Sequence, residues 1–249
     1  FEAFVGAHYG PDQMILSAAG GVDHDAIVAA AERIFGRLKP VGRSAIQPAR
    51  FVGGERREVK DLEQAHVALG FQGPAYRDED LYVSQIYTTA LGGGMSSRLF
   101  QKIREERGLC YSIYAQGGSY DDTGMITISA GTSAEENGDL CGLTIDELKR
   151  AAEDMTEAEV ARARAQMKAG LLMGLESPSS RAERLARYLT IWDRVPTLAE
   201  ATARIDAVTR ADVLAYAERL VGGADTALAL YGPVGAAPTL DAIRNRLAA

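Results

Sequence analysis

The chain has 249 residues, of which 47% are hydrophobic and 24% charged, a composition typical of one or two globular domains. Its formal net charge of −7 argues against nucleic acid as a partner, because phosphate binding requires clustered Lys and Arg. No apolar run approaches the roughly 20 residues needed to span a bilayer, so we expect no membrane segment. Cys110 and Cys141 show no disulfide-framework pattern and are expected to be reduced, buried or half-buried thiols.

Two distant segments share a pattern of residues. Leu16–Leu38 and Leu228–Ala248 each indicate a short apolar strand, a Gly, a loop and a helix opened by Asp-Ala-Ile, with Gly20 matching Gly232. If the repeat is real, each of two domain-sized units ends with the same strand-and-helix element. Residues 1–40 are then the tail of a first domain whose leading part, on the order of 170 residues, lies outside this chain. Strand-Gly-helix is a common arrangement, so a chance match is an equal alternative.

The next part of the chain has the pattern of a complete second domain. Residues 41–55 contain Pro and Gly without periodicity and are expected to be a linker to a domain over 56–249. Two strands are predicted within 57–73, followed by a helix within 77–94 and a half-buried strand over 124–132.

The second half of the chain is predicted to be helical. Capping boxes mark helix starts at Thr156 with Glu159, Ser180 with Glu183 and Thr197 with Glu200, and a weaker one at Thr209 with Asp212. The chain ends with a strand and a helix. We therefore expect an α+β fold in which antiparallel sheets carry helices packed on one face.

The stretch "RLFQKIREERGLCYSIY", residues 98–114, indicates a short charged helix that stops at Gly108 and leads into a strand. Arg104 and Tyr111 stand seven positions apart at this corner. Taken alone, each residue has a structural explanation. Tyr111 shares a predicted strand face with Ile113 and Ala115, which would make it a core residue, and Arg104 could be a solvated helix charge.

The stretch "GGGMSS", residues 92–97, follows a helix and lacks the Gly-Lys-Ser/Thr ending of a phosphate-binding loop. We predict that Gly92 provides a left-handed helix cap and that Ser96 or Ser97 caps the next helix. Cys110 adjoins Tyr111, but no His in its sequence context would activate it as a nucleophile.

Two stretches resemble the pitrilysin-type (M16) zinc metallopeptidases, which include mitochondrial processing peptidase and insulin-degrading enzyme. They are "HYGPDQMILSAAGGVDHDAIVAAAERIFG" and "LGGGMSSRLFQKIREERGLCYSIYAQGGSYDDTGMITISAGT". The first is similar to the end of that family's first domain, and the second to its second, metal-free domain. Bacterial two-domain relatives of the processing peptidase fit best. The resemblance implies the half-enzyme fold of these peptidases over nearly the whole chain.

The resemblance also implies zinc, which this family holds through an H-x-x-E-H motif in the first domain. The three histidines of this chain, at positions 8, 24 and 66, do not begin such a motif. We therefore expect zinc in the full-length or assembled enzyme and none bound by this chain, which alone should be inactive.

By the same resemblance, Arg104 and Tyr111 correspond to an Arg and a Tyr, seven residues apart, that reach the peptide near the metal from the opposite half of a closed chamber. Gly92, Gly93 and Gly94 correspond to a glycine-rich loop that takes part in substrate handling in the processing peptidase. A purely structural turn is the alternative for this loop.

The function expected from the resemblance is the non-zinc, C-terminal part of a zinc metalloendopeptidase that cleaves peptides or unfolded segments. This part supplies chamber wall and substrate contacts. Its partners would be a peptide substrate and either its own N-terminal zinc domain or a zinc-bearing subunit, in a homodimer or heterodimer. The alternative is a catalytically inactive family member that serves as partner subunit or scaffold, as the respiratory-complex core proteins do.

Overall fold

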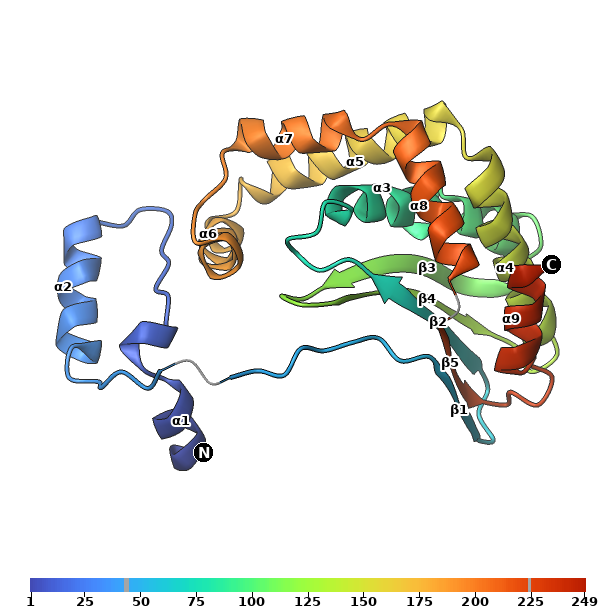
Figure 1. The fold of residues 1–249 in the computed structure, drawn as a ribbon, viewed down its shortest axis with the longest axis horizontal. Coiled ribbons are helices and arrows are strands. Elements are labelled where there is room, and N and C mark those ends of the chain that lie inside the picture. The colour runs from blue at the N-terminus through green and yellow to red at the C-terminus, as the bar shows by residue number, and fades with distance from the viewer. Residues whose placement is uncertain (43–44, 224) are drawn as a thin grey trace. The chain divides into compact units, whose positions relative to one another are not determined.

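The computed structural model describes residues 1–42, 45–223 and 225–249 (Figure 1). Contacts between the elements divide the chain into two compact units, which are described separately. The first comprises Phe1–Pro48 and Ala169–Glu200, and the second comprises Ala49–Lys168 and Ala201–Ala249. None of the described helices is both long enough and apolar enough to cross a membrane.

The second unit is built on a β-sheet. Its described residues form five strands in the order β1-β5-β2-β4-β3. The strands are β1 (Gly54–Val59), β2 (Ala65–Gly73), β3 (Cys110–Ser119), β4 (Gly124–Thr132) and β5 (Thr226–Gly232). The strands predicted within 57–73 and over 124–132 are confirmed. Neighbouring strands are antiparallel except β1 and β5, which pair in parallel. The α+β class is therefore confirmed with a mixed sheet. The connection between β1 and β5 includes three strands and several helices, so it is long enough for β5 to lie beside β1 in the parallel direction.

One face of this sheet carries the core. On β2, Val67, Leu69 and Phe71 are 4%, 1% and 2% exposed, whereas the alternating residues His66 and Gln72 face away from the core and are exposed. This two-residue period is that of a strand with one buried face. The helices packed on the buried face include α3 (Leu81–Gly92), α4 (Asn137–Asp154), α8 (Arg210–Gly222) and α9 (Leu240–Ala248) (Figure 1). The prediction of helices on one face is confirmed.

The second unit also contains most of α5 (Glu157–Gly174), and α7 (Leu198–Ala207) leads into it. The capping box before α5 is confirmed, because the N–H groups of Thr156 and Glu159 each donate to the other side chain, at 2.8 Å and 3.3 Å. The boxes at Thr197 and Thr209 are confirmed in the same way.

The box predicted at Ser180 is wrong. Helix α6 (Pro178–Trp192) begins earlier, and its N-cap is Ser177, whose Oγ accepts from the Ser180 N–H at 3.3 Å. The reason is Pro178, which lacks an N–H and has a helix-compatible φ, so that it favours the first helical position.

The first unit contains α1 (Glu2–His8), a 3₁₀ turn η1 (Pro11–Gln13), α2 (His24–Phe35) and α6. No residue of α1 or α2 is buried. The short apolar strand predicted at the start of the repeat segment Leu16–Leu38 does not form, since no other strand pairs with this described segment and an unpaired strand has no ladder of hydrogen bonds.

The turn that follows this segment nevertheless matches its counterpart at the other end of the chain. Gly20 and Gly232 have positive φ values of 110° and 105°. The N–H of Val22 donates to the Gly20 carbonyl at 2.9 Å, and Val234 donates to Gly232 at the same distance. The two repeat segments thus share an unusual backbone geometry as well as a residue pattern.

Candidate functional site

Arg104 lies on a π-helical segment, η2 (Phe100–Glu105), in which the Glu106 N–H donates to the Gln101 carbonyl five residues earlier at 2.9 Å. The helix ends at Gly108, whose φ of 65° is left-handed and whose N–H donates to the Arg104 carbonyl at 3.1 Å. The predicted short helix and its stop are confirmed, but its π form was not predicted. Short π segments occur often at functional sites.

Tyr111 lies on a β-bulge and not on the core face of its strand. The pairing of β3 with β4 shifts register between Cys110 and Ser112, so the alternation of faces is broken there. Ile113 and Ala115 are 4% and 6% exposed, but Tyr111 is 80% exposed. The structural explanation of Tyr111 as a core residue is therefore wrong.

The guanidinium of Arg104 stacks on two rings. Its Cζ lies 4.5 Å from the ring centroid of Phe100 and 5.0 Å from that of Tyr111. The Arg104 side chain is 33% exposed, and its nearest carboxylate among the described residues is that of Glu105, at 3.7 Å. The cation is thus oriented by cation–π contacts while its N–H groups stay available to a ligand.

The glycines that precede this corner have steric roles. Gly92 is the last residue of α3, and a Cβ there would collide with the Ala115 backbone of β3. The left-handed cap predicted at Gly92 is wrong, because the chain leaves the helix at Gly93 with a φ of −86°. Ser97 precedes the next helix, but its hydroxyl donates to the Gly94 carbonyl at 2.6 Å instead of accepting from the helix.

We call Gly92–Ser97 the glycine loop. Three of its carbonyls accept hydrogen bonds from long side chains: Gln166 Nε2 donates to Gly93 at 3.0 Å, Gln101 Nε2 to Met95 at 2.6 Å, and Arg162 Nη2 to Ser96 at 3.1 Å. Gln101 belongs to η2, so the loop and the segment that carries Arg104 are joined directly. The structure therefore brings the predicted glycines and the Arg104–Tyr111 corner into one region.

Below the loop, Arg98 forms a partly buried ion-pair network. Its Nε and Nη2 donate to the two carboxylate oxygens of Glu159 at 2.6 Å and 2.9 Å, and its Nη1 donates to Asp154 at 2.5 Å. Burial by itself would raise the pKa of Glu159, but hydrogen bonds from Arg98 and Thr156 outweigh it and lower the pKa to about 2. This network fixes the start of the helix that carries Arg104.

The two cysteines are free and buried, as expected. Burial raises the pKa of the Cys110 thiol, and the nearby charge of Arg104 offsets only part of that effect. A thiol held protonated is a poor nucleophile. Cys110 therefore offers no activated thiolate beside Tyr111.

The residues present do not form a zinc site. The three histidines lie on separate elements, His8 on α1, His24 on α2 and His66 on β2. No two of them therefore share a helix. Over residues 1–42, 45–223 and 225–249, no group of three or more His, Cys, Asp or Glu side chains is arranged to hold a metal ion.

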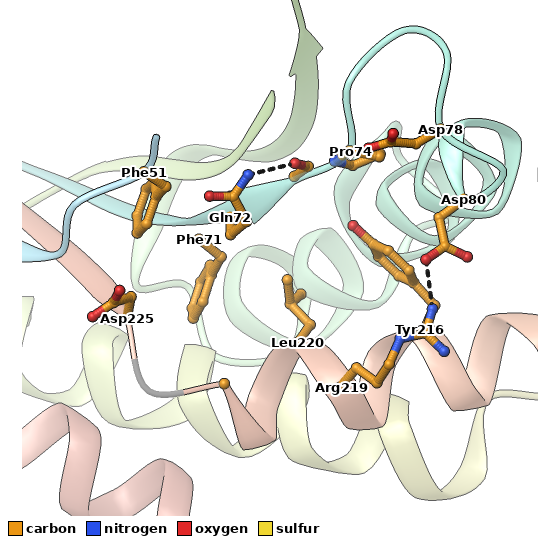
Figure 2. A pocket seen from close by; sticks show the side chains of 12 residues that line it. Phe51, Phe71, Gln72, Pro74, Asp78, Asp80, Tyr216, Arg219, Leu220 and Asp225 are labelled. Atoms are coloured by element: carbon orange, nitrogen blue, oxygen red, sulfur yellow. Dashed lines mark hydrogen bonds and ion pairs between the residues drawn. The ribbon is translucent and has the colours of Figure 1, made fainter. Parts of the chain in front are cut away.

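A separate pocket of about 500 Å³ lies between β2 and α8, where Phe71 faces Leu220 and Tyr216 (Figure 2). Two of its carboxylates serve the fold itself. Asp80 pairs with Arg219 at 2.7 Å, and Asp78 accepts from the Ala75 N–H at 2.8 Å. Since neither Arg104 nor Tyr111 lines this pocket, we do not assign it to the candidate site.

Several residues that shape the site were missed in the sequence. Phe100 could have been found, because it precedes Arg104 by four positions on one helix face. Arg162 and Gln166 carry no local signal, since they reach the glycine loop from a helix 66 and 73 positions further along the chain.

Comparison with known proteins places this chain in a family. The domain family described as "Peptidase M16 inactive domain" matches residues 1–167. A protein of Rickettsia bellii described as an "Uncharacterized zinc protease" is 37% identical over 234 residues, which cover 94% of this chain and 57% of that protein. A zinc protease of Mycobacterium tuberculosis, also described as uncharacterized, is 36% identical over 246 residues. The match covers 96% of this chain and 56% of that protein. The chain thus spans little more than half the length of these relatives.

The fold has a counterpart among solved structures. A chain of complex III2 from Candida albicans, solved with Inz-5 bound, matches with a TM-score of 0.81 and 25% identity, over 92% of this chain and 57% of that one. The expected half-enzyme fold and the expected bacterial relatives are both confirmed. The chain belongs to the M16 peptidase family and carries that family's inactive domain.

Proposed function

We propose that this chain is the non-zinc, C-terminal part of a zinc metalloendopeptidase that acts on peptides or unfolded segments. It provides chamber wall and, through Arg104 and Tyr111, contacts to the substrate. The observation that carries this proposal is the stacked pair itself, with Arg104 Cζ 5.0 Å from the ring centroid of Tyr111. The zinc-protease descriptions of the relatives support the reaction class, and zinc would be held outside the residues described.

Each side chain of the pair has a distinct task. The exposed phenol of Tyr111 donates its O–H to the oxygen of the scissile carbonyl as negative charge develops there. The planar guanidinium of Arg104, a fork of N–H donors, binds a backbone carbonyl or a carboxylate of the peptide. This contact fixes the register of the peptide. The glycine loop contributes a substrate contact beside them, with Met95 75% exposed at its tip.

The test is turnover of a quenched fluorogenic peptide by the full-length protein with Tyr111→Phe. Loss of one oxyanion donor is expected to lower kcat by roughly 10- to 1000-fold. The matched control is Tyr120→Phe, since Tyr120 is 61% exposed in the hairpin after β3 and outside the candidate site. Turnover that stays at the wild-type level in Tyr111→Phe would remove Tyr111 from the mechanism.

We further propose that residues 1–40 close a first domain, that 41–55 link the two, and that 56–249 form the second, of which Ala169–Glu200 clusters by its contacts with Phe1–Pro48. The support is the matched turn at Gly20 and Gly232 together with the helix caps that follow. Asp23 Oδ1 accepts from the Ala26 N–H at 2.8 Å, and Thr239 Oγ1 accepts from Ala242 at 3.2 Å. In the second domain the corresponding strand, β5, is paired on both sides by β1 and β2.

A second candidate is a partner subunit or scaffold without catalysis, favoured by the fold match to a chain of complex III2. The partner would be a zinc domain of the same protein or a zinc-bearing subunit, in a homodimer or heterodimer. Zinc content and turnover of the full-length protein separate the two candidates. Equimolar zinc with peptide cleavage supports the peptidase part, and a metal-free, inactive protein supports the scaffold.

A further inference from the structure

The pocket between β2 and α8 lies outside the Arg104–Tyr111 corner and has a chemistry of its own (Figure 2). Its volume of about 500 Å³ is in the range of small-molecule sites. All of its lining residues belong to the second unit. Two walls lie where regular elements end, β2 at Gly73 and α8 at Gly222, and a third is Phe51, from the segment that leads into β1.

The inner wall of the pocket is aromatic and aliphatic. Phe71 and Leu220 are only 2% and 9% exposed, and the half-buried Phe51 lines the pocket with them (Figure 2). Tyr216 adds a third ring, whose hydroxyl is hydrogen-bonded to Ser84. A ligand that fills this space therefore has an apolar part that packs against rings.

The polar side chains of the lining offer acceptors to a ligand more than donors. Gln72 Nε2 donates to the Gly73 carbonyl at 2.9 Å and to Thr123 Oγ1 at 3.2 Å. These hydrogen bonds orient the amide and leave its Oε1 as an acceptor. Arg219 is the only cationic side chain among the described lining residues, and Asp80 already pairs with it at 2.7 Å.

The other two carboxylates of the lining, Asp78 and Asp225, have no cationic partner among the described residues. Asp78 accepts one hydrogen bond, from the Ala75 N–H at 2.8 Å, and Asp225 is exposed. Three carboxylates and one guanidinium give the lining a formal charge of −2. Acceptors without compensating charge, beside aromatic rings, are complementary to an organic cation.

We infer that this pocket binds an organic cation with an alkyl stem, a guanidinium or an ammonium. The stem packs on Phe71 and Leu220, and the head donates to Asp225 and to Gln72. Such a cation has two sources, a free small molecule or the side chain of a Lys or Arg residue. The inference does not depend on the proposed peptidase function, since neither Arg104 nor Tyr111 lines the pocket.

The experiment is isothermal titration calorimetry on the full-length protein with two pairs of probes. N-Butylguanidinium represents a free cation, and its neutral counterpart is N-butylurea. A tripeptide with a central Arg, acetylated and amidated at its ends, represents a side chain, and its counterpart carries citrulline. A cation is expected to bind roughly tenfold more tightly than its counterpart at low ionic strength. This preference is expected to shrink as salt is added.

Variants assign the preference to the pocket. Asp225→Asn is expected to reduce it to about twofold, because the amide keeps an acceptor but loses the charge. Asp61→Asn is the matched control and is expected to keep the full preference. Asp61 is also exposed, but it precedes β2, whereas the pocket lies where this strand ends. Circular dichroism and the thermal midpoint check that each variant is folded.

The inference is overturned if neither cation is preferred to its neutral counterpart, or if Asp225→Asn leaves the preference unchanged. A preference for N-butylguanidinium alone supports a free small molecule as the ligand, and a preference for the Arg tripeptide alone supports a side chain. Because no turnover is measured, these outcomes are independent of the Tyr111→Phe assay.

Discussion

At Arg104 the structure orients a charge without neutralising it. The guanidinium Cζ lies 4.5 Å from the ring centroid of Phe100 and 5.0 Å from that of Tyr111, and the carboxylate of Glu105 lies 3.7 Å from Nε. Stacking limits the rotamers of a long side chain and so reduces the entropy lost when a ligand binds. The edge of the guanidinium, which carries its N–H donors, remains available.

Arg104→Lys should therefore be a damaging substitution although it keeps the charge. An ammonium cannot form the paired hydrogen bonds of the fork, so KM of the full-length protein should rise about tenfold with a smaller change in kcat. Steady-state kinetics on a fluorogenic peptide measures both constants. The control is Lys102→Arg, because Lys102 pairs with Glu106 on the same segment, at 2.9 Å. A KM that is unchanged in Arg104→Lys would contradict the role of the fork.

The sequence predicted the corner and its two side chains but not their environment. The spacing of seven positions and the stop at Gly108 follow from local pattern. The exposure of Tyr111 depends on a register shift between two strands, and a bulge of this kind leaves no mark in the residues themselves. Alternation therefore assigned Tyr111 to the wrong face.

At the scale of elements, the glycine loop is held by side chains from its neighbours. Gln166 of α5 donates to the Gly93 carbonyl at 3.0 Å, and Gln101 of η2 donates to Met95 at 2.6 Å. Glycine removes side-chain restraints from a loop, so these hydrogen bonds add to its local order, together with those of Arg162 to Ser96 and of Ser97 to Gly94.

Gln166→Leu is expected to loosen the loop while the fold stays intact. Amide exchange over Gly92–Ser97 should become roughly tenfold faster, in line with loss of about one hydrogen bond's net stability. Hydrogen–deuterium exchange with mass spectrometry reads this directly. The control is Lys168→Met on the same helix, whose partner is Asp206 at 2.6 Å. Equal exchange in the two variants would show that Gln166 does not hold the loop.

The Arg98 network makes stability depend on pH in an acidic window. The pKa of Glu159 is about 2 in the fold, below its usual value of 4.5. A lowered pKa means that ionised Glu159 stabilises the fold above about pH 4.5, and this contribution disappears as the pH falls toward 2. Urea midpoints measured across this window should fall more steeply for wild type than for Glu159→Gln. The control is Glu157→Gln, whose side chain is 61% exposed, and it should follow wild type.

Element types were predicted more successfully than their pairing. Periodicity identified β2 and β4, and the caps at Thr156 and Thr197 marked helix starts, because these signals are local. The parallel contact of β1 with β5 joins residues more than 170 positions apart, from Gly54 with Ala227 onward, and no local pattern encodes it. Pro178 overrode the apparent box at Ser180 for a reason that is itself local and was overlooked.

At the scale of the whole molecule, the two ends of the chain have matched turns but different surroundings. In α9, Ile243 packs into the second unit and is only 2% exposed. Helix α2 has no buried residue, and its Ile34 is 61% exposed. Large apolar side chains gathered on a surface helix commonly mark an interface. This contrast supports the proposal that α2 packs in a first domain, as α9 does in the second.

Ile34→Asp tests that arrangement by comparing two lengths of the protein. In the 249-residue chain the side chain is exposed, so the free energy of unfolding should change by no more than about 0.5 kcal/mol. In the full-length protein an Asp at a packed position leaves an unpaired charge in an apolar contact and should cost roughly 3 kcal/mol. The control is Ile46→Asp in the proposed linker, where Ile46 is 80% exposed and both lengths should tolerate the change. Urea unfolding of wild type and both variants at the two lengths, six proteins in all, decides the question, because a small effect of Ile34→Asp at both lengths would mean that α2 has no domain to pack against.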